Sequence, residues 1–198
     1  MSDILGMYSY IREDAAVKEL FEVNWKQALG TAVVAGSLMF GNNMVANADA
    51  KPTIVQQKVQ IDMPKLLHAL KQVESSGGTD KRDRYEPKFE EKYLIDNDSN
   101  LGSRTKAAIA KYGTKQVATS YGPYQIMAAT AYDRGFAGKP EDLRNESTCK
   151  TYAEKYINWL LNRPKVKTLE DVISAYNAGA GGVGTNPDYV SKVMKHYK

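Results

Sequence analysis

The sequence predicts a mainly α-helical fold, in which a single domain over residues 63–198 follows an N-terminal apolar arm over residues 1–50 and a linker over residues 51–62. Apolar residues recur at helical spacing through most of the predicted domain, which favours amphipathic helices. A chain of 198 residues, 42% hydrophobic and 25% charged, is long enough for one compact domain and a short appendage. The net charge is −3 over residues 1–50 and +7 over residues 51–198, which separates the arm from the rest.

The arm contains an apolar stretch, residues 28–41, followed by small-x-small sites at residues 46–48 and 48–50, as in a secretory signal. A helix of these 14 residues is about 21 Å long, shorter than the roughly 30 Å core of a bilayer. We therefore expect contact with a membrane rather than a stable span. Because the preceding residues are too many and too acidic for an ordinary signal, a pro-segment, a targeting arm or a particle-packaging arm fits as well. A helix packed on the domain is the remaining alternative.

A linker with a short extended stretch, residues 53–59, leads to the first predicted helix, residues 64–74. Pro64 lies near the first turn of this helix. The apolar residues at helical spacing are Leu66, Leu67, Leu70 and Val73. The sequence Ser-Ser-Gly-Gly at residues 75–78 ends the helix, which places Glu74 at its C-terminal end.

Residues 79–100 are predicted to form a long polar excursion, with a charged run at residues 80–84 and three aromatic residues. Those aromatic residues are Tyr85, Phe89 and Tyr93. Stacking on sugar rings and packing of the excursion onto the domain are both open for their rings. Further helices are predicted at residues 104–117, 128–136, 145–162, 168–178 and 187–197. Thr168 and Asp171 have the spacing of a capping box.

Several kinds of chemistry are excluded by composition and spacing. Cys149 is the one cysteine, so no intrachain disulfide can form, and we expect it to be a buried small hydrophobe. His68 and His196 are far apart and no Cys/His/Asp cluster has ligand spacing, so no metal site is predicted. The basic residues are spread through the sequence rather than grouped with aromatic residues on one helix, so nucleic acid is not an expected partner.

Glu74 is the first candidate for catalysis. Cleavage of a glycosidic bond needs an acid that stays protonated near neutral pH and delivers a proton to the leaving oxygen. A carboxyl against apolar surface at the C-terminal end of a helix meets this need, because desolvation and the negative end of the helix dipole both raise its pKa. Taken alone, a glutamate in this position is more often a solvated terminal charge.

Three segments occur in order along the sequence. They are Val73-Glu74-Ser75-Ser76-Gly77, Ser120-Tyr121-Gly122-Pro123-Tyr124-Gln125-Ile126-Met127 and Ala175-Tyr176-Asn177-Ala178-Gly179. Together they resemble the soluble lytic transglycosylase and goose-type lysozyme group, over roughly residues 63–198. The resemblance implies a lysozyme-like fold and an enzyme without a cofactor that cleaves the β-1,4 bond between MurNAc and GlcNAc in bacterial peptidoglycan.

The resemblance also implies a set of site residues. Glu74 matches the catalytic acid/base, and the substrate-binding positions are Ser75, Gln125, Met127, Tyr176 and Asn177. Ser75 would help to order the site, Gln125 would line the cleft beside the reacting sugar, and Tyr176 and Asn177 would form the cleft floor close to the catalytic carboxyl. A phenol and an amide can position a carboxyl without adding negative charge, so we expect these neutral donors to keep Glu74 protonated.

Two departures from the family pattern leave the reaction outcome open. Residues 79–119 form a longer excursion than in the bacterial transglycosylases, similar to some phage-encoded muramidases and goose-type lysozymes, and Ala128 replaces the usual proline. In a lytic transglycosylase one carboxyl acts as acid and then as base, and the muramyl C6 hydroxyl closes a 1,6-anhydro product. A hydrolytic muramidase needs a second carboxylate to activate water. The candidates for it are Glu86, Glu90, Asp96 and Asp98, and the single-carboxyl mechanism is favoured.

A non-catalytic glycan-binding component of a virion or secretion apparatus is the alternative from another class. The presence of Glu74 with Gln125 and Tyr176 favours an enzyme. The acidic arm and the long excursion favour a phage wall-penetrating or lysis protein, located in the virion, over a bacterial enzyme exported to the periplasm or cell envelope. Through residues 1–50 the chain is expected to contact other virion or envelope proteins.

Overall fold

The computed structural model describes residues 59–198. The apolar arm, its stretch at residues 28–41 and nearly all of the extended stretch predicted at residues 53–59 lie outside the described residues. Within the described part of the chain, no helix is long and apolar enough to cross a membrane, and no group of three or more His, Cys, Asp or Glu residues is placed to hold a metal ion.

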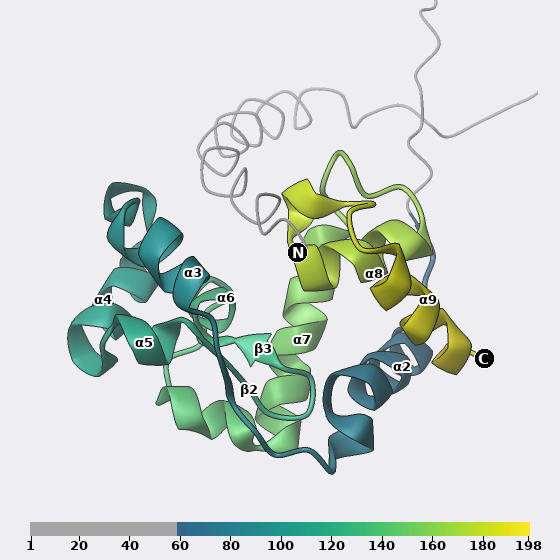
Figure 1. Ribbon diagram of the computed structural model, residues 1–198, viewed down its shortest axis with the longest axis horizontal. Helices are drawn as coiled ribbons and strands as arrows, with labels where there is room; N and C mark the ends of the chain where they lie inside the picture. The colour runs from purple at the N-terminus through teal and green to yellow at the C-terminus, as the bar shows by residue number, and fades with distance from the viewer. Residues whose placement is uncertain (1–58) are drawn as a thin grey trace, which may run out of the picture.

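The described chain is mostly helical, as predicted. In order, the longer helices are α2 (Met63–Ser75), α4 (Ser103–Tyr112), α6 (Ala128–Asp133), α7 (Glu146–Leu160), α8 (Leu169–Ala178) and α9 (Pro187–His196). Short helical turns connect them: η2 (Ser76–Gly78), α3 (Pro87–Phe89), the π-helical η3 (Glu90–Ile95), η4 (Asp98–Asn100), α5 (Thr114–Val117), η5 (Pro140–Arg144) and η6 (Ala180–Gly182). Figure 1 shows α7 running between a half that contains α3 to α6 and a half that contains α2, α8 and α9.

The core is built around α7, which packs against α2, α6 and α8. Its inward face is fully buried at Ile157 and Leu160, as are Leu66 and Leu70 on α2. Their spacing of three or four residues sets the apolar side chains on one side of each helix. The first predicted helix is therefore confirmed, and its C-terminal end is anchored against the central helix.

The helix ends follow local signals in the sequence. Thr168 and Asp171 form the predicted capping box at the start of α8, each side chain accepting a backbone N–H of the other residue. Asn145 caps α7 by accepting the N–H of Thr148. The single helix predicted at residues 104–117 is wrong, because Gly113, with φ of +86°, divides it into α4 and α5.

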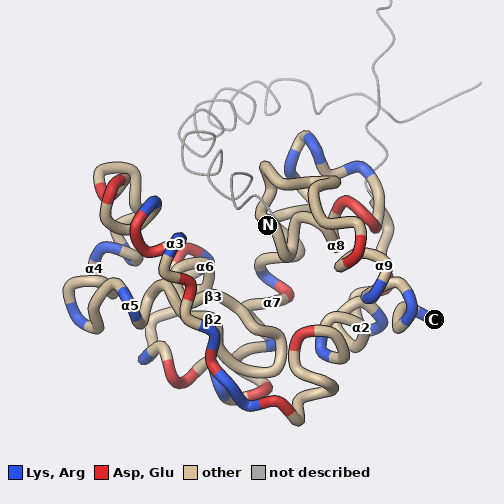
Figure 2. The backbone as a smooth tube through the Cα atoms, in the orientation of Figure 1, with Lys and Arg blue, Asp and Glu red and all other residues tan. Residues whose placement is uncertain are grey.

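The excursion at residues 79–100 is more ordered than predicted. It contributes β1 (Arg84–Tyr85) to a small antiparallel sheet with β2 (Thr119–Tyr121) and β3 (Ile126–Met127), in the order β1-β2-β3. Strands of two or three residues are too short for an alternating pattern to reveal. Figure 2 shows the charged run at residues 80–84 leading from the end of α2 to this sheet. The sheet thereby brings the excursion to the C-terminal end of α2.

Of the three aromatic residues in the excursion, Phe89 and Tyr93 are buried and 5.5 Å apart between ring centroids. Tyr85 is exposed, at 40% of its surface. Packing onto the domain therefore accounts for Tyr93, whereas Phe89 packs onto the domain and also lines a cavity described below. The prediction for Cys149 is also confirmed, because its side chain is fully buried.

Candidate active site

Glu74 lies in the last turn of α2 with only 6% of its side chain exposed. Burial raises the pKa of its carboxyl above the ordinary value of 4.5, because a charged carboxylate is poorly solvated there. Two groups act in the opposite direction. They are a hydrogen bond from Tyr189 and the positive charge of Arg84. The net direction is upward, which suits a proton donor.

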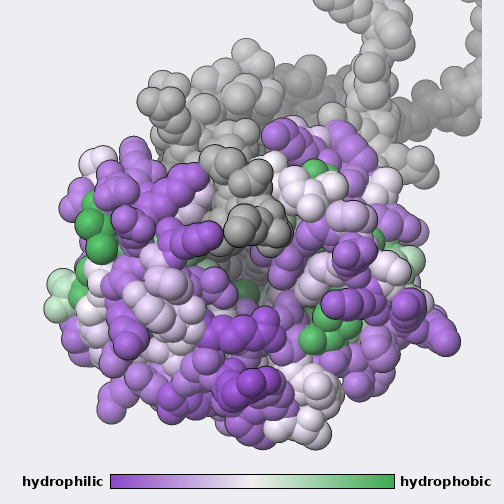
Figure 3. All heavy atoms as spheres, in the orientation of Figure 1, coloured by the Kyte–Doolittle hydropathy of each residue, from purple (hydrophilic) through white to green (hydrophobic). Residues whose placement is uncertain are grey.

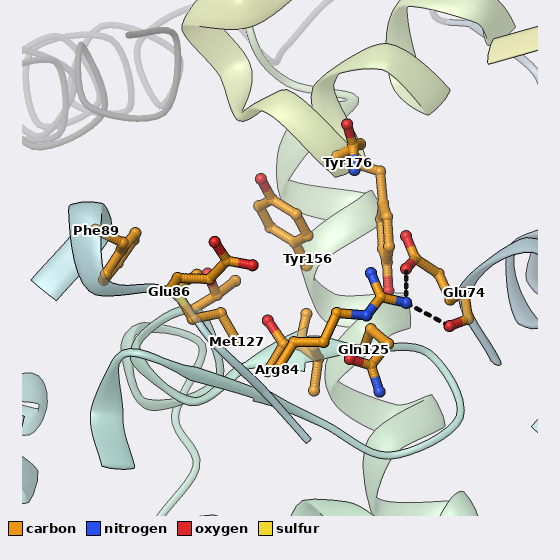
Figure 4. Close-up of a pocket in the computed structure, with 12 residues that line it drawn as sticks. Glu74, Arg84, Glu86, Phe89, Gln125, Met127, Tyr156 and Tyr176 are labelled. Atoms are coloured by element: carbon orange, nitrogen blue, oxygen red, sulfur yellow. Dashed lines mark hydrogen bonds and ion pairs between the residues drawn. The ribbon is translucent and has the colours of Figure 1, made fainter. Parts of the chain in front are cut away.

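The two carboxyl oxygens of Glu74 face different partners. The phenol of Tyr189, on α9, donates to Oε1 at 2.6 Å. The guanidinium of Arg84, on β1, lies 3.4 Å from Oε2 and donates to the backbone carbonyl of Glu74 at 2.6 Å. Figure 4 shows the guanidinium reaching two oxygen atoms of this residue, one of the carboxyl and that of the backbone carbonyl.

The contact with Arg84 corrects the expected electrostatics in two respects. The donors around Glu74 are not all neutral. In addition, Arg84 hydrogen-bonds a carbonyl of the last turn of α2, so that it offsets the negative end of the helix dipole. Burial is therefore the cause that raises the pKa of Glu74.

Ser75 is buried behind Glu74 and lines neither of the two cavities described below. Its hydroxyl donates to the carbonyl of Pro123 at 2.7 Å and to that of Lys71 at 3.1 Å. The first bond ties the end of α2 to the turn between β2 and β3. Ser75 therefore positions Glu74 relative to that turn, and no cavity-facing atom supports contact with a substrate.

Gln125 occupies that turn in a left-handed conformation, with φ of +45°. Its Nε2 donates to the carbonyls of Gly122 at 3.0 Å and Arg82 at 3.1 Å. Its Oε1 is buried and has no hydrogen-bond partner among the described residues. A buried acceptor without a partner is energetically costly.

The tight turn depends on Gly122, whose φ is +72°. A Cβ atom on this residue would lie 2.1 Å from the carbonyl oxygen of Leu143 and 2.9 Å from Sγ of Cys149. No larger side chain fits without a shift of the backbone of η5. The glycine in the Gly-x-x-Gln segment therefore sets how closely the turn approaches α7.

Tyr176 and Asn177 come from the end of α8. The phenol of Tyr176 is buried and donates to the carbonyl of Tyr124 at 2.8 Å, so the hydroxyl that contacts Glu74 belongs to another tyrosine. Oδ1 of Asn177 accepts a hydrogen bond from Nδ2 of Asn186 at 2.8 Å. Both residues of the Tyr-Asn pair face the cavity beside Glu74.

Two cavities meet at Glu74. The first, about 200 Å³, lies between the sheet, α3, α7 and α8, and the second, about 550 Å³, lies between α2, β1 and α9. Glu74, Arg84 and Asn177 line both. Of the predicted substrate-binding residues, Gln125, Met127, Tyr176 and Asn177 line the first cavity. Figure 3 shows the hollow between the two halves of the molecule, with hydrophilic side chains at its rim.

Among the four candidates for a second carboxylate, Glu86 alone lines the first cavity. It follows β1, so that its side chain and that of Arg84, two residues earlier, point to the same face of the strand. Figure 4 shows its carboxyl across the cavity from Glu74. Glu90 instead accepts hydrogen bonds from the hydroxyls of Tyr85 and Thr114. Asp96 and Asp98 are exposed and line neither cavity.

A helical domain with one buried carboxyl at the junction of two polar cavities has the arrangement required for acid-catalysed cleavage of a glycosidic bond. The family model of the transglycosylase SLT domain matches residues 53–197, and the chain belongs to this family. The family comprises peptidoglycan lytic transglycosylases, so the chain is an enzyme of that kind with a lysozyme-like fold. No curated protein and no solved structure gives a significant match.

Two residues that contact Glu74 were missed from the sequence. Tyr189 stands in the helix predicted at residues 187–197, but nothing local links it to a residue 115 positions earlier. Arg84 belongs to the charged run at residues 80–84, and no pattern in the sequence distinguishes it from the other charged residues there. Three others of the run form ion pairs elsewhere, Arg82 with Asp80 and Asp83 with Arg144, each at 2.6 Å.

Proposed function

We infer that this chain cleaves the β-1,4 bond between MurNAc and GlcNAc in peptidoglycan, with Glu74 acting first as acid and then as base. The observation that carries this proposal is the buried carboxyl with a raised pKa at the junction of two cavities. A glycan strand that passes from one cavity to the other brings a glycosidic oxygen to Glu74. Because the carboxyl keeps its proton above its ordinary range, it can donate near neutral pH.

The proposed reaction has two steps. In the first, the Glu74 carboxyl protonates the leaving glycosidic oxygen while the carbonyl oxygen of the substrate's N-acetyl group bonds to C1, and the C1–O bond breaks. In the second, the Glu74 carboxylate takes the proton of the muramyl C6 hydroxyl, whose oxygen bonds to C1 and releases the N-acetyl oxygen. The product is a 1,6-anhydro sugar. We assign the N-acetyl N–H to Gln125, because this residue lines the first cavity and its Oε1 has no hydrogen-bond partner among the described residues.

Substitution Glu74→Gln tests this proposal. The variant keeps the size and hydrogen-bonding capacity of the side chain but has no proton of suitable pKa, so it should no longer reduce the turbidity of purified sacculi, while it still sediments with them. Glu91→Gln is the matched control, because Glu91 is exposed and lines neither cavity. Continued lysis by the Glu74 variant would contradict the proposal.

A hydrolytic outcome is a second candidate, and the position of Glu86 favours it. The carboxyl of Glu86 lines the first cavity without a hydrogen bond or ion pair to any other described residue, so it is available to orient a water molecule. Mass spectrometry of digested sacculi separates the outcomes. Anhydro-muramyl ends indicate the transglycosylase, reducing ends that disappear in Glu86→Gln indicate the hydrolase, and binding without products indicates a glycan-binding component.

We also propose that the chain acts in a phage particle or during lysis, with export to the bacterial envelope as the alternative. The long acidic segment before residues 28–41 supports this proposal, as does the length of residues 79–119, which separate the Glu74 segment from the Gly-x-x-Gln segment. Mass spectrometry of the protein from expressing cells distinguishes the alternatives. Cleavage after residue 48 or 50 would indicate an exported enzyme, and an intact arm would indicate a docking segment for virion proteins or a membrane.

A further inference from the structure

Arg84 occupies the junction of the two cavities and lines both of them. Its side chain remains 49% exposed. Since β1 alternates its side chains, Arg84 points into the cleft while Tyr85 points away from it, where its ring lies under Lys115. A glycan strand that passes from one cavity to the other has to displace this guanidinium.

With Arg84 in place, both oxygens of the Glu74 carboxyl face a donor. Tyr189 donates to Oε1, and the guanidinium lies 3.4 Å from Oε2. Both contacts favour the charged carboxylate, whereas the reaction begins from the protonated acid. With Arg84 in place, the pKa of Glu74 is therefore raised less than burial alone would raise it. The ion pair at 3.4 Å to a half-exposed side chain is weak, but the guanidinium also donates to the backbone carbonyl of Glu74 at 2.6 Å, so a substrate group has to replace that charge-assisted hydrogen bond when it displaces Arg84.

The chemistry of the substrate supplies a partner for the displaced cation. Each muramyl residue bears a lactyl group that continues into a peptide with free carboxylates, and a guanidinium binds carboxylates through paired hydrogen bonds. Lys192, on α9, adds a second cation to the wall of the larger cavity, where Asp188 is the opposing charge. That cavity is therefore able to receive an anionic group.

We propose that Arg84 is a substrate-displaced latch: a carboxylate attached to the muramyl residue draws the guanidinium away from Glu74, so that the acid loses its adjacent cation and becomes a better proton donor when an anionic strand occupies the larger cavity. Arg84 is in this sense a positioning and specificity-determining residue. The proposal rests on the function inferred for Glu74. It predicts that the enzyme cleaves neutral glycans more slowly than anionic ones, because a neutral strand does not draw Arg84 away from Glu74.

Several titratable or charged groups face Glu74. They are Arg84 on β1, Glu86 after it, Cys149 on α7, Tyr176 on α8, and Asp188, Tyr189 and Lys192 on α9. Among the described residues, Arg84 is the one cation within 4 Å of the carboxyl. Its removal therefore changes the charge around the acid more than removal of any other group in this set.

The first test compares Arg84→Gln with the unsubstituted chain on two preparations of sacculi, one untreated and one whose carboxylates have been converted to neutral amides. The unsubstituted chain should cleave untreated sacculi about fivefold faster, the ratio expected of one exposed ion pair. The variant should cleave both at similar rates. Arg84→Lys should keep part of the preference. Arg82→Gln is the matched control, because Arg82 carries the same charge but is 86% exposed and lines neither cavity.

The second readout is the pH profile on soluble anionic strands. The profile of kcat/KM reports the acid of the free enzyme and that of kcat reports the acid of the complex. In the unsubstituted chain the alkaline limb of kcat/KM should lie below that of kcat. In Arg84→Gln the two limbs should coincide, with that of kcat/KM shifted upward by about half a pH unit. A purely structural role would leave both limbs in place.

Two results would overturn the latch. In the first, Arg84→Gln keeps the same ratio of cleavage rates on untreated and amidated sacculi, and the same alkaline limbs of kcat and kcat/KM, as the unsubstituted chain. In the second, Arg84→Gln melts normally but cleaves neither preparation of sacculi. These outcomes are separate from a failure of the proposed function. If Glu74→Gln still lyses sacculi, Glu74 is not the acid. If it does not, the Arg84 variants test the latch alone.

Discussion

Tyr189→Phe isolates one hydrogen bond at the acid. It removes only the hydroxyl that donates to Oε1 of Glu74 at 2.6 Å. A hydrogen bond to an ionised group contributes about 1.5–3 kcal/mol, and because Tyr189 is partly exposed we take about 1.5 kcal/mol, which corresponds to about one pKa unit. The bond favours the carboxylate and lowers the pKa of Glu74. Its loss should therefore raise that pKa.

The assay is the pH dependence of sacculus cleavage. In Tyr189→Phe the alkaline limb should move upward by about one pH unit, since the acid keeps its proton to higher pH. The plateau of kcat should fall, because the carboxyl loses a group that fixes its orientation. Tyr176→Phe is the control: its hydroxyl bonds the carbonyl of Tyr124, so the variant should lose about 1 kcal/mol of stability and keep the limb in place. A limb that does not move in Tyr189→Phe would refute the assignment.

Three further outcomes are expected. Gly122→Ala should lower the free energy of unfolding by about 3 kcal/mol, against about 1 kcal/mol for Gly184→Ala, where φ is also positive but the space is open, as measured by denaturant titration. Burial raises the pKa of Glu74, so the stability that this group contributes is fully present below pH 4.5 and is lost as the pH rises through the raised value. Glu74→Gln should therefore melt a few degrees higher than the unsubstituted chain at neutral pH. In calorimetric scans at acid pH this difference in melting temperature should vanish. Asn186→Ala removes the hydrogen bond that holds Asn177 and should raise KM for soluble wall strands more than it lowers kcat.

Local signals in the sequence were sufficient for most of the longer helices and for part of the site. Apolar spacing placed α2, and the capping residues placed the start of α8. The break at Gly113 was missed because a glycine within a helical pattern does not by itself report a positive φ. Gln125 and Asn177 could be named because they stand in short motifs. Their partners could not, because each belongs to another element.

The sheet and the surroundings of Glu74 depend on contacts that are distant in sequence. Strand β1 pairs with β2 across more than thirty residues, at Arg84 and Ser120, and neither strand is long enough to show an alternating pattern. The sequence predicted only neutral donors around Glu74 for the same reason, and the cation Arg84 was missed. The position of Arg84 beside the end of α2 follows from this pairing.

The contact between α2 and α9 has a consequence for biosynthesis. Glu74 and Tyr189 are 115 residues apart, so at 5–20 residues per second a ribosome needs roughly 6 to 23 seconds to pass from one to the other. During that interval the nascent domain contains its acid but not the helix that orients it. The order of synthesis therefore delays the completed site until residues 187–196 have emerged and docked.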